Sequence, residues 1–277
     1  MLLFAGCRCA DGGPVAAAPP ASASASASAS ASAPVVLPPL AGPALQELPL
    51  GAGRAELSVP VGATSASPLV VVLQGAREDA LDRAVAWRDI AGPAPFVLAV
   101  PRPAGPSPLD AGDPASAASE GVERALRSAL AALKRTHTAH VGAGPIVLVG
   151  VRESAPDAIR IARQEPAFFA RLVLVEGGAD AWGAGVAAVH ARGGGKGVVF
   201  VCRSPRCEAA ARLHLHPAGV AGLDAGVLVA GSGDAEVELS RRLRAWWPGW
   251  LAGRAAASSA APPGASAAAP SARPPER

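Results

Sequence analysis

Two cysteines and two histidines lie close together in the sequence, and these side chains can bind a metal ion or form a disulfide. Cys202 and Cys207 are separated by four residues, and His214 and His216 follow at alternate positions. These spacings fit zinc only loosely, because alternate residues on a helix point away from each other. In an exported protein the cysteines favour a disulfide, with free thiols and a metal site as alternatives. We expect no metal.

A glycine-rich segment, GGGKG at 193–197, has the composition of a phosphate-binding loop. A true phosphate loop follows a strand, opens a helix and carries Ser or Thr after its Lys. Here the strand-like run comes after the glycines, and Gly197 stands at the hydroxyl position. The segment is predicted to be a plain loop, and we expect no cofactor.

The composition bounds the functions that the chain can have. The 277 residues carry a formal net charge of +3, and their arginines are scattered without basic runs or interleaved aromatic residues. This distribution gives no indication of nucleic-acid binding. No stretch reaches the roughly 20 apolar residues that span a bilayer.

The N-terminus indicates export. Small residues Ala5 and Gly6 precede Cys7, as at the end of a bacterial lipoprotein signal. Such a signal also needs a basic segment and about 7 to 15 apolar residues, and only a short stub precedes Cys7. A truncated leader with a lipid-modified Cys7 is one interpretation, and a chance cysteine is the other.

Low-complexity segments flank the middle of the chain. Ala and Ser alternate strictly from Ala21 to Ala33, and the segment 254–277 is again rich in Ala, Pro and Ser. Such stretches bury too little apolar surface to offset their ordering entropy. We expect a leader and disordered tether at 1–44, a folded domain at 45–252 and a disordered tail at 253–277. The location predicted is the bacterial cell envelope, with membrane contact only through Cys7.

The middle of the chain alternates strand-like and helical patterns. Short apolar runs typical of strands buried on both faces occupy 69–73, 96–100, 146–149, 172–175, 198–201 and 226–229. Helical spacing of apolar residues occupies 78–90, 116–136, 157–164, 209–215 and 237–246. The segments 46–50 and 55–59 indicate an antiparallel hairpin. The order predicts a doubly wound α/β sheet.

The turn after the third buried strand resembles that of the α/β-hydrolase superfamily, in particular its esterase and dienelactone-hydrolase-like members. That family places Gly-x-Ser-x-Gly at this strand-to-helix turn, and here Gly150 and Ser154 flank Arg152. PLVVVLQGA at 68–76 resembles the strand that runs into the oxyanion segment, with Gln74 and Gly75 there. GVVFVCRSP and GVLVAGSGD resemble the last two strands. The resemblance implies an α/β-hydrolase-like, mostly parallel sheet with an N-terminal antiparallel edge hairpin.

The resemblance also implies three catalytic positions, each of which holds another residue type. Arg152 stands at the nucleophile position, although an arginine stays protonated and only donates. The loop 203–206 has no carboxylate where the acid is implied, and Asp234 stands where the family has its histidine. A carboxylate serves as a base near neutral pH only if its pKa rises by several units. A salt bridge between Arg152 and Asp234 is one hypothesis, and structural neutrality of both residues is the favoured alternative.

The sequence therefore predicts an exported, catalytically degenerate pseudohydrolase that acts by binding a ligand or partner, whose identity it leaves open. The alternative is an active esterase-like hydrolase with relocated catalytic residues. Ser154 has the hydroxyl nearest to the nucleophile position, but the start of the helix requires a small residue there for packing. Glu176 follows a strand where some family members keep an acid, and we expect it to cap or pair. None of the five histidines is placed like the missing base.

Overall fold

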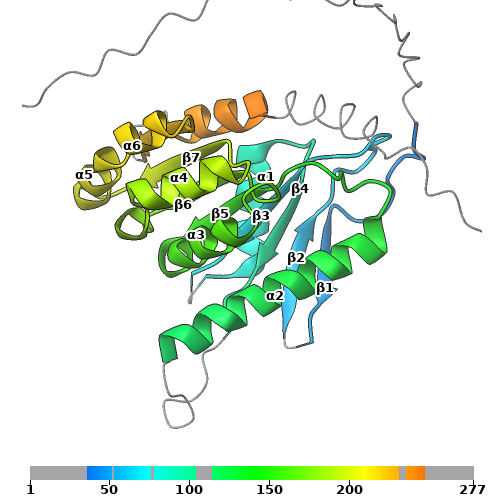
Figure 1. Cartoon of the computed structure of the whole chain (residues 1–277). Coiled ribbons are helices and arrows are strands. Elements are labelled where there is room, and N and C mark those ends of the chain that lie inside the picture. The colour runs from blue at the N-terminus through cyan, green and yellow to red at the C-terminus, as the bar shows by residue number, and fades with distance from the viewer. Residues whose placement is uncertain (1–35, 52, 76–77, 104–113, 231–234, 247–277) are drawn as a thin grey trace, which may run out of the picture. The chain divides into compact units, whose positions relative to one another are not determined.

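An eight-stranded, mostly parallel sheet forms the centre of the fold (Figure 1). The computed structural model describes residues 36–51, 53–75, 78–103, 114–230 and 235–246. The strand order is β1-β2-β4-β3-β5-β6-β7-β8. The strands are β1 (Leu45–Pro49), β2 (Arg54–Ser58), β3 (Leu69–Leu73), β4 (Phe96–Val100), β5 (Val147–Val151), β6 (Arg171–Val175), β7 (Gly197–Cys202) and β8 (Asp224–Val229).

The pairing directions confirm the predicted fold class. Strands β3 to β8 pair parallel to one another, whereas β2 runs antiparallel to both β1 and β4. The predicted hairpin at the edge of the sheet is therefore present. Because the carboxyl ends of the six parallel strands meet at one edge, the loops that follow them are brought together there.

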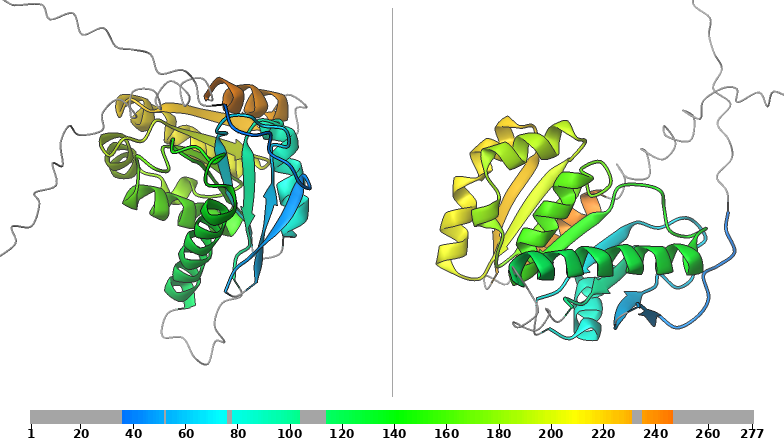
Figure 2. Two further views of the ribbon diagram at one scale, coloured as in Figure 1. Left: turned by 90° about the vertical axis from the view of Figure 1, so that its right-hand side faces the viewer. Right: turned by 60° about the horizontal axis from the view of Figure 1, so that its bottom comes forward.

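Helices cover both faces of the sheet (Figure 2). Buried side chains of α1 and of the helical segment 235–246 pack on one face, and those of α2 to α6 pack on the other. The bounds are α1 (Ala80–Ala91), α2 (Pro114–His137), α3 (Ala155–Gln164), α4 (Ala184–Arg192), α5 (Pro205–Leu213) and α6 (Leu215–Val220), with short 3-10 turns at Arg152–Ser154 and Ala179–Ala181. No helix in the described ranges is long and apolar enough to cross a membrane.

The central strands explain why the sequence contains continuous apolar runs. All five residues of β3 are buried, with Val70 and Val72 packing on one face and Val71 and Leu73 on the other. Covering both faces removes every side chain of the strand from water, so no polar alternation remains. Valine, leucine and alanine fill most of both layers.

The main differences from the prediction concern the segment 205–220, helix α4 and the start of the domain. The single helix expected at 209–215 is two helices, α5 and α6. Helix α5 begins at Pro205, four residues before the predicted start, where Ser204 caps it. Helix α4 was not predicted. Ordered contacts begin before the predicted domain start at 45: the Leu37 and Leu40 amides donate to the Thr64 and Ala63 carbonyls, at 2.8 and 3.0 Å. Residues 1–35, with Cys7, and 247–277 lie outside the described part.

Candidate functional site

A strained turn follows β5 at the carboxyl edge of the sheet. Arg152 has a φ of 50°, a left-handed conformation that side chains other than glycine rarely adopt. The two glycines beside it leave no room for a side chain. A Cβ on Gly150 would lie 2.6 Å from the Ala155 Cα, and one on Gly177 would lie 2.6 Å from the Arg152 carbonyl oxygen. The turn thus has the strand-to-helix geometry that the resemblance implied, with Arg152 at its apex.

The Arg152 side chain is half exposed and pairs with Glu78. Its Nη1 lies 3.8 Å from the Glu78 Oε1, and the Arg83 Nη2 lies 2.6 Å from the same oxygen. The Glu78 side chain is only 6% exposed. The hypothesised pairing between Arg152 and Asp234 cannot be assessed, because Asp234 lies outside the described residues. Sequence reasoning missed Glu78, which no motif distinguishes from its acidic neighbours.

The segment predicted to be oxyanion-like, Gln74 and Gly75, directs its polar groups into the protein. The Gln74 side chain is buried and donates to the Asp79 carbonyl at 3.3 Å. The Gly75 amide donates to the Glu78 Oε2 at 3.2 Å. In hydrolases such amides stabilise the negative charge that develops on the substrate oxygen. Here a carboxylate already accepts the Gly75 hydrogen bond.

A buried polar network supports the turn from below. The Ser154 hydroxyl donates to the Gln74 carbonyl and accepts from the Arg102 Nη1 at 3.2 Å. The same Arg102 nitrogen lies 2.6 Å from the Asp157 Oδ2. Ser154 is fully buried. Its hydroxyl is therefore engaged as a support of the turn, as the packing interpretation of this residue expected.

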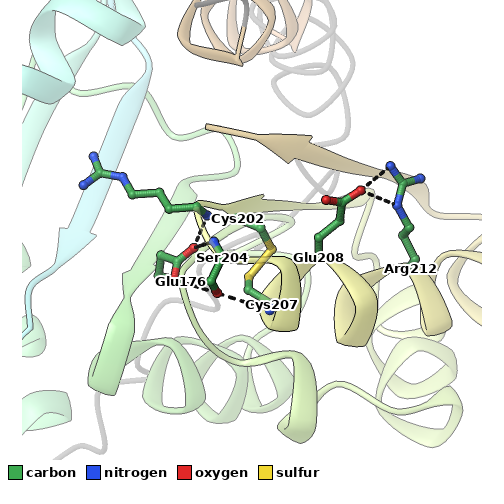
Figure 3. Close-up of a disulfide and its surroundings, with 7 residues drawn as sticks. Glu176, Cys202, Ser204, Cys207, Glu208 and Arg212 are labelled. Carbon is green, nitrogen blue, oxygen red and sulfur yellow. Dashed lines mark hydrogen bonds and ion pairs between the residues drawn. A yellow bond between two sulfur atoms is a disulfide. The ribbon is translucent and has the colours of Figure 1, made fainter. Parts of the chain in front are cut away.

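The loop after β7 has a disulfide where the resemblance implied a catalytic acid (Figure 3). Cys202 and Cys207 are bonded, one of the three states that their spacing left open. Glu176 reaches into this loop from the end of β6. Its carboxylate accepts from the Arg203 amide and from the Ser204 amide, the latter at 2.9 Å. The Ser204 hydroxyl lies 3.3 Å from the same carboxylate and caps α5. Glu176 thus acts as a loop cap.

The histidines whose contacts are described lie away from the strained turn. The His137 Nε2 lies 3.2 Å from the Gln46 Oε1, and the His140 Nε2 lies 2.9 Å from the Pro38 carbonyl oxygen, near the amino ends of the parallel strands. His190 is buried in α4 against Gly195, and its burial lowers the pKa of the imidazole. In the described ranges, no three His, Cys, Asp or Glu side chains are grouped to hold a metal ion.

A small cavity opens at the carboxyl ends of β5, β6 and β7. Its volume is about 120 Å³. Val151, Val175 and Val201 line it from neighbouring strands, and Trp87 and Leu239 line it from helices. A larger hollow, of about 720 Å³, lies between α1 and the helical segment 235–246 and is more open to solvent. The smaller cavity is the better candidate site, since ligands of open α/β sheets bind at strand carboxyl ends.

Comparisons with known proteins identify the fold. No family model and no curated protein sequence matches the chain. A dienelactone hydrolase from Anabaena variabilis has a similar structure, at 12% identity and a TM-score of 0.50, over 75% of this chain and 99% of that one. Mycobacterium tuberculosis MPT51 matches at 13% and 0.50, over 77% and 100%. A thermostable esterase matches at 16% and 0.45, over 74% of this chain but 58% of its own length. The chain has the α/β-hydrolase fold.

Proposed function

We propose that this protein is a non-catalytic member of the α/β-hydrolase fold that acts by binding a ligand at the carboxyl edge of its sheet. The observation that carries the proposal is the occupation of the turn by Arg152, together with the Glu78 carboxylate on the Gly75 amide. An arginine cannot attack a carbonyl carbon, because it stays protonated. A carboxylate beside the amide would repel the negative charge of a tetrahedral intermediate.

The alternative, an active esterase with relocated residues, has two candidate nucleophiles. Ser154 is buried, and its hydroxyl is held between the Gln74 carbonyl and Arg102. Ser204 lies beside Glu176, but that carboxylate already accepts hydrogen bonds from two backbone amides and serves to cap the loop. A serine needs a base matched to neutral pH within hydrogen-bond reach. The contacts of both serines therefore favour the non-catalytic proposal.

A labelling experiment tests the proposal. The purified full chain is treated with a fluorophosphonate probe and, separately, with p-nitrophenyl acetate and butyrate, beside a serine esterase as the positive control. We expect neither labelling nor turnover above that of a heat-denatured sample. Labelling that disappears in Ser154→Ala or Ser204→Ala would overturn the proposal and identify the relocated nucleophile. The two serines serve as controls for each other.

We also propose that the protein is exported and attached to the cell envelope through Cys7. The small residues before Cys7 and the Ala/Ser/Pro tether after it support this location. The Cys202–Cys207 disulfide is consistent with an oxidising compartment. Growth with an alkyne palmitate analogue should label the protein, and Cys7→Ser should abolish the label while Cys9→Ser retains it. Equal labelling of both variants would contradict the anchor.

A further inference from the structure

The cavity at the ends of β5, β6 and β7 combines an apolar interior with charged residues among its lining. Trp87, Val151 and Leu239 in its wall are each less than 5% exposed. Arg83, Arg203 and Glu236 also line it, each with a charged end group. An apolar interior with a few charged groups is the usual composition of a small-molecule site.

We infer that this cavity binds a monocarboxylate with a compact apolar body, of about the size of benzoate. The inference rests on the proposed function, because it names the class of ligand that the non-catalytic site would hold. The volume of about 120 Å³ limits the apolar body. A dry protein cavity of about 150 Å³ accommodates benzene. The cavity here is smaller, so its apolar body is limited to at most a single ring or a short branched chain, and a long acyl chain is excluded.

One guanidinium among the lining residues is available to bind a negative charge. The charged groups that line the cavity are the guanidinium groups of Arg83 and Arg203 and the carboxylate of Glu236. Glu78 pairs with Arg83 at 2.6 Å. Within the described ranges no carboxylate pairs with the Arg203 guanidinium. A guanidinium can bind a carboxylate, or a phosphate, through two parallel hydrogen bonds.

The position of Arg203 is fixed by its own loop. Its amide donates to Glu176, and the Cys202–Cys207 disulfide closes the loop around it (Figure 3). A backbone that is already ordered reduces the entropy lost when the side chain binds an anion. The loop at the implied catalytic-acid position thus has an ordered backbone, and Arg203 on this loop lines the apolar cavity.

Fluorine NMR on the full chain tests the inference directly. The probe is 4-fluorobenzoate, and 4-fluorobenzyl alcohol is a neutral molecule of similar shape. We expect line broadening of the benzoate with a Kd on the order of 1 mM or tighter, as ligand efficiencies allow for a ligand of this size. The alcohol should bind at least tenfold more weakly. Inorganic phosphate, an anion without an apolar body, should not compete at equal concentration.

Three variants locate the site. Arg203→Ala should weaken 4-fluorobenzoate at least tenfold and leave the alcohol unchanged. Arg212→Ala is the matched control, because this arginine pairs with Glu208 on α5 and does not line the cavity (Figure 3). Ala235→Leu adds volume to the wall and should weaken both probes. Circular dichroism establishes that each variant is folded.

The inference would be overturned if the two probes bound with equal affinity, or if Arg203→Ala and Arg212→Ala lost equal affinity for 4-fluorobenzoate. It would also be overturned if 10 mM 4-fluorobenzoate, roughly tenfold above the expected Kd, showed no line broadening. Competition by phosphate at equal concentration would also overturn it and would indicate a plain anion site. The binding measurement involves no turnover, so its outcome is distinguishable from that of the labelling and hydrolysis assays. Ester hydrolysis by a chain that still binds benzoate through Arg203 would refute the proposed function alone.

Discussion

The ion pair beneath the strained turn should be a main determinant of stability. Arg102 and Asp157 have side-chain exposures of 15% and 4%, and 2.6 Å separates their charged atoms. Replacing Arg102 by alanine leaves the Asp157 carboxylate buried without its partner. Breaking a buried pair in this way costs about 3 to 5 kcal/mol. Because Arg102 retains some exposure, water can partly replace it, and we expect a loss near the lower end, about 3 kcal/mol.

Urea denaturation followed by far-ultraviolet circular dichroism measures this loss. With a urea m-value of about 2 kcal/mol/M, a loss of about 3 kcal/mol lowers the midpoint by about 1.5 M. The control is Arg212→Ala, whose pair with Glu208 has exposures of 59% and 28%. Exposed pairs of this kind contribute about 0.2 to 1 kcal/mol, so its midpoint should shift by less than about 0.5 M.

A double variant separates loss of the pair from loss of packing. In the Arg102→Ala background, Asp157→Asn removes the unpaired charge and should recover at least about 1 kcal/mol, because a buried amide costs less than a buried carboxylate. The reasoning would be refuted by equal midpoint shifts in Arg102→Ala and Arg212→Ala. It would also be refuted if Asp157→Asn lowered the midpoint of Arg102→Ala further.

Three further expectations concern α4, its following loop and the disulfide. A Cβ on Gly195 would lie 2.2 Å from the His190 ring, so Gly195→Ala should cost about 1 to 3 kcal/mol in urea denaturation, whereas Gly219→Ala, with open space around it, should be nearly neutral. Burial lowers the pKa of His190 below its ordinary 6.5, so the unfolded state binds the proton first. Stability should therefore fall as the pH drops below about 6.5, by at most about 1.4 kcal/mol per pH unit. His190→Phe should flatten this slope, and an unchanged slope would contradict the assignment. Replacing Cys202 and Cys207 by alanine should lower the free energy of unfolding by about 2 kcal/mol by calorimetry, since their short loop restrains the unfolded chain only modestly. An unchanged melting temperature would refute this.

The strands and the strained turn could be predicted because their signals are local. A strand buried on both faces, such as β3, is apolar at every position, and the sequence contains that run without interruption. Gly150 and Arg152 were placed at the turn by the resemblance to the α/β-hydrolase superfamily, and the φ of 50° at Arg152 agrees. Helix α4 carries no comparable signal. Its Ala, Gly and Val residues give almost no polar face, and only packing against the sheet defines it.

The ion pairs around the site could not be predicted, because they depend on tertiary placement. Glu78 pairs with Arg152 across 74 positions, and Arg102 pairs with Asp157 across 55. The sequence has 25 basic and 22 acidic residues, so many other pairings are equally compatible with it. Only the sheet topology, which places the loops after β3, β4 and β5 side by side, selects these partners.

The backbone of the strained turn is fixed independently of the side chain at position 152. A left-handed residue other than glycine costs roughly 1 to 2 kcal/mol, so the turn needs support from the residues packed around it. The close packing at Gly150 and Gly177 and the Arg102 network fix the backbone whichever side chain Arg152 carries. The side chain at the apex is thus presented at the strand ends regardless of its chemistry. A serine there would be exposed as a nucleophile; an arginine is exposed as a cation.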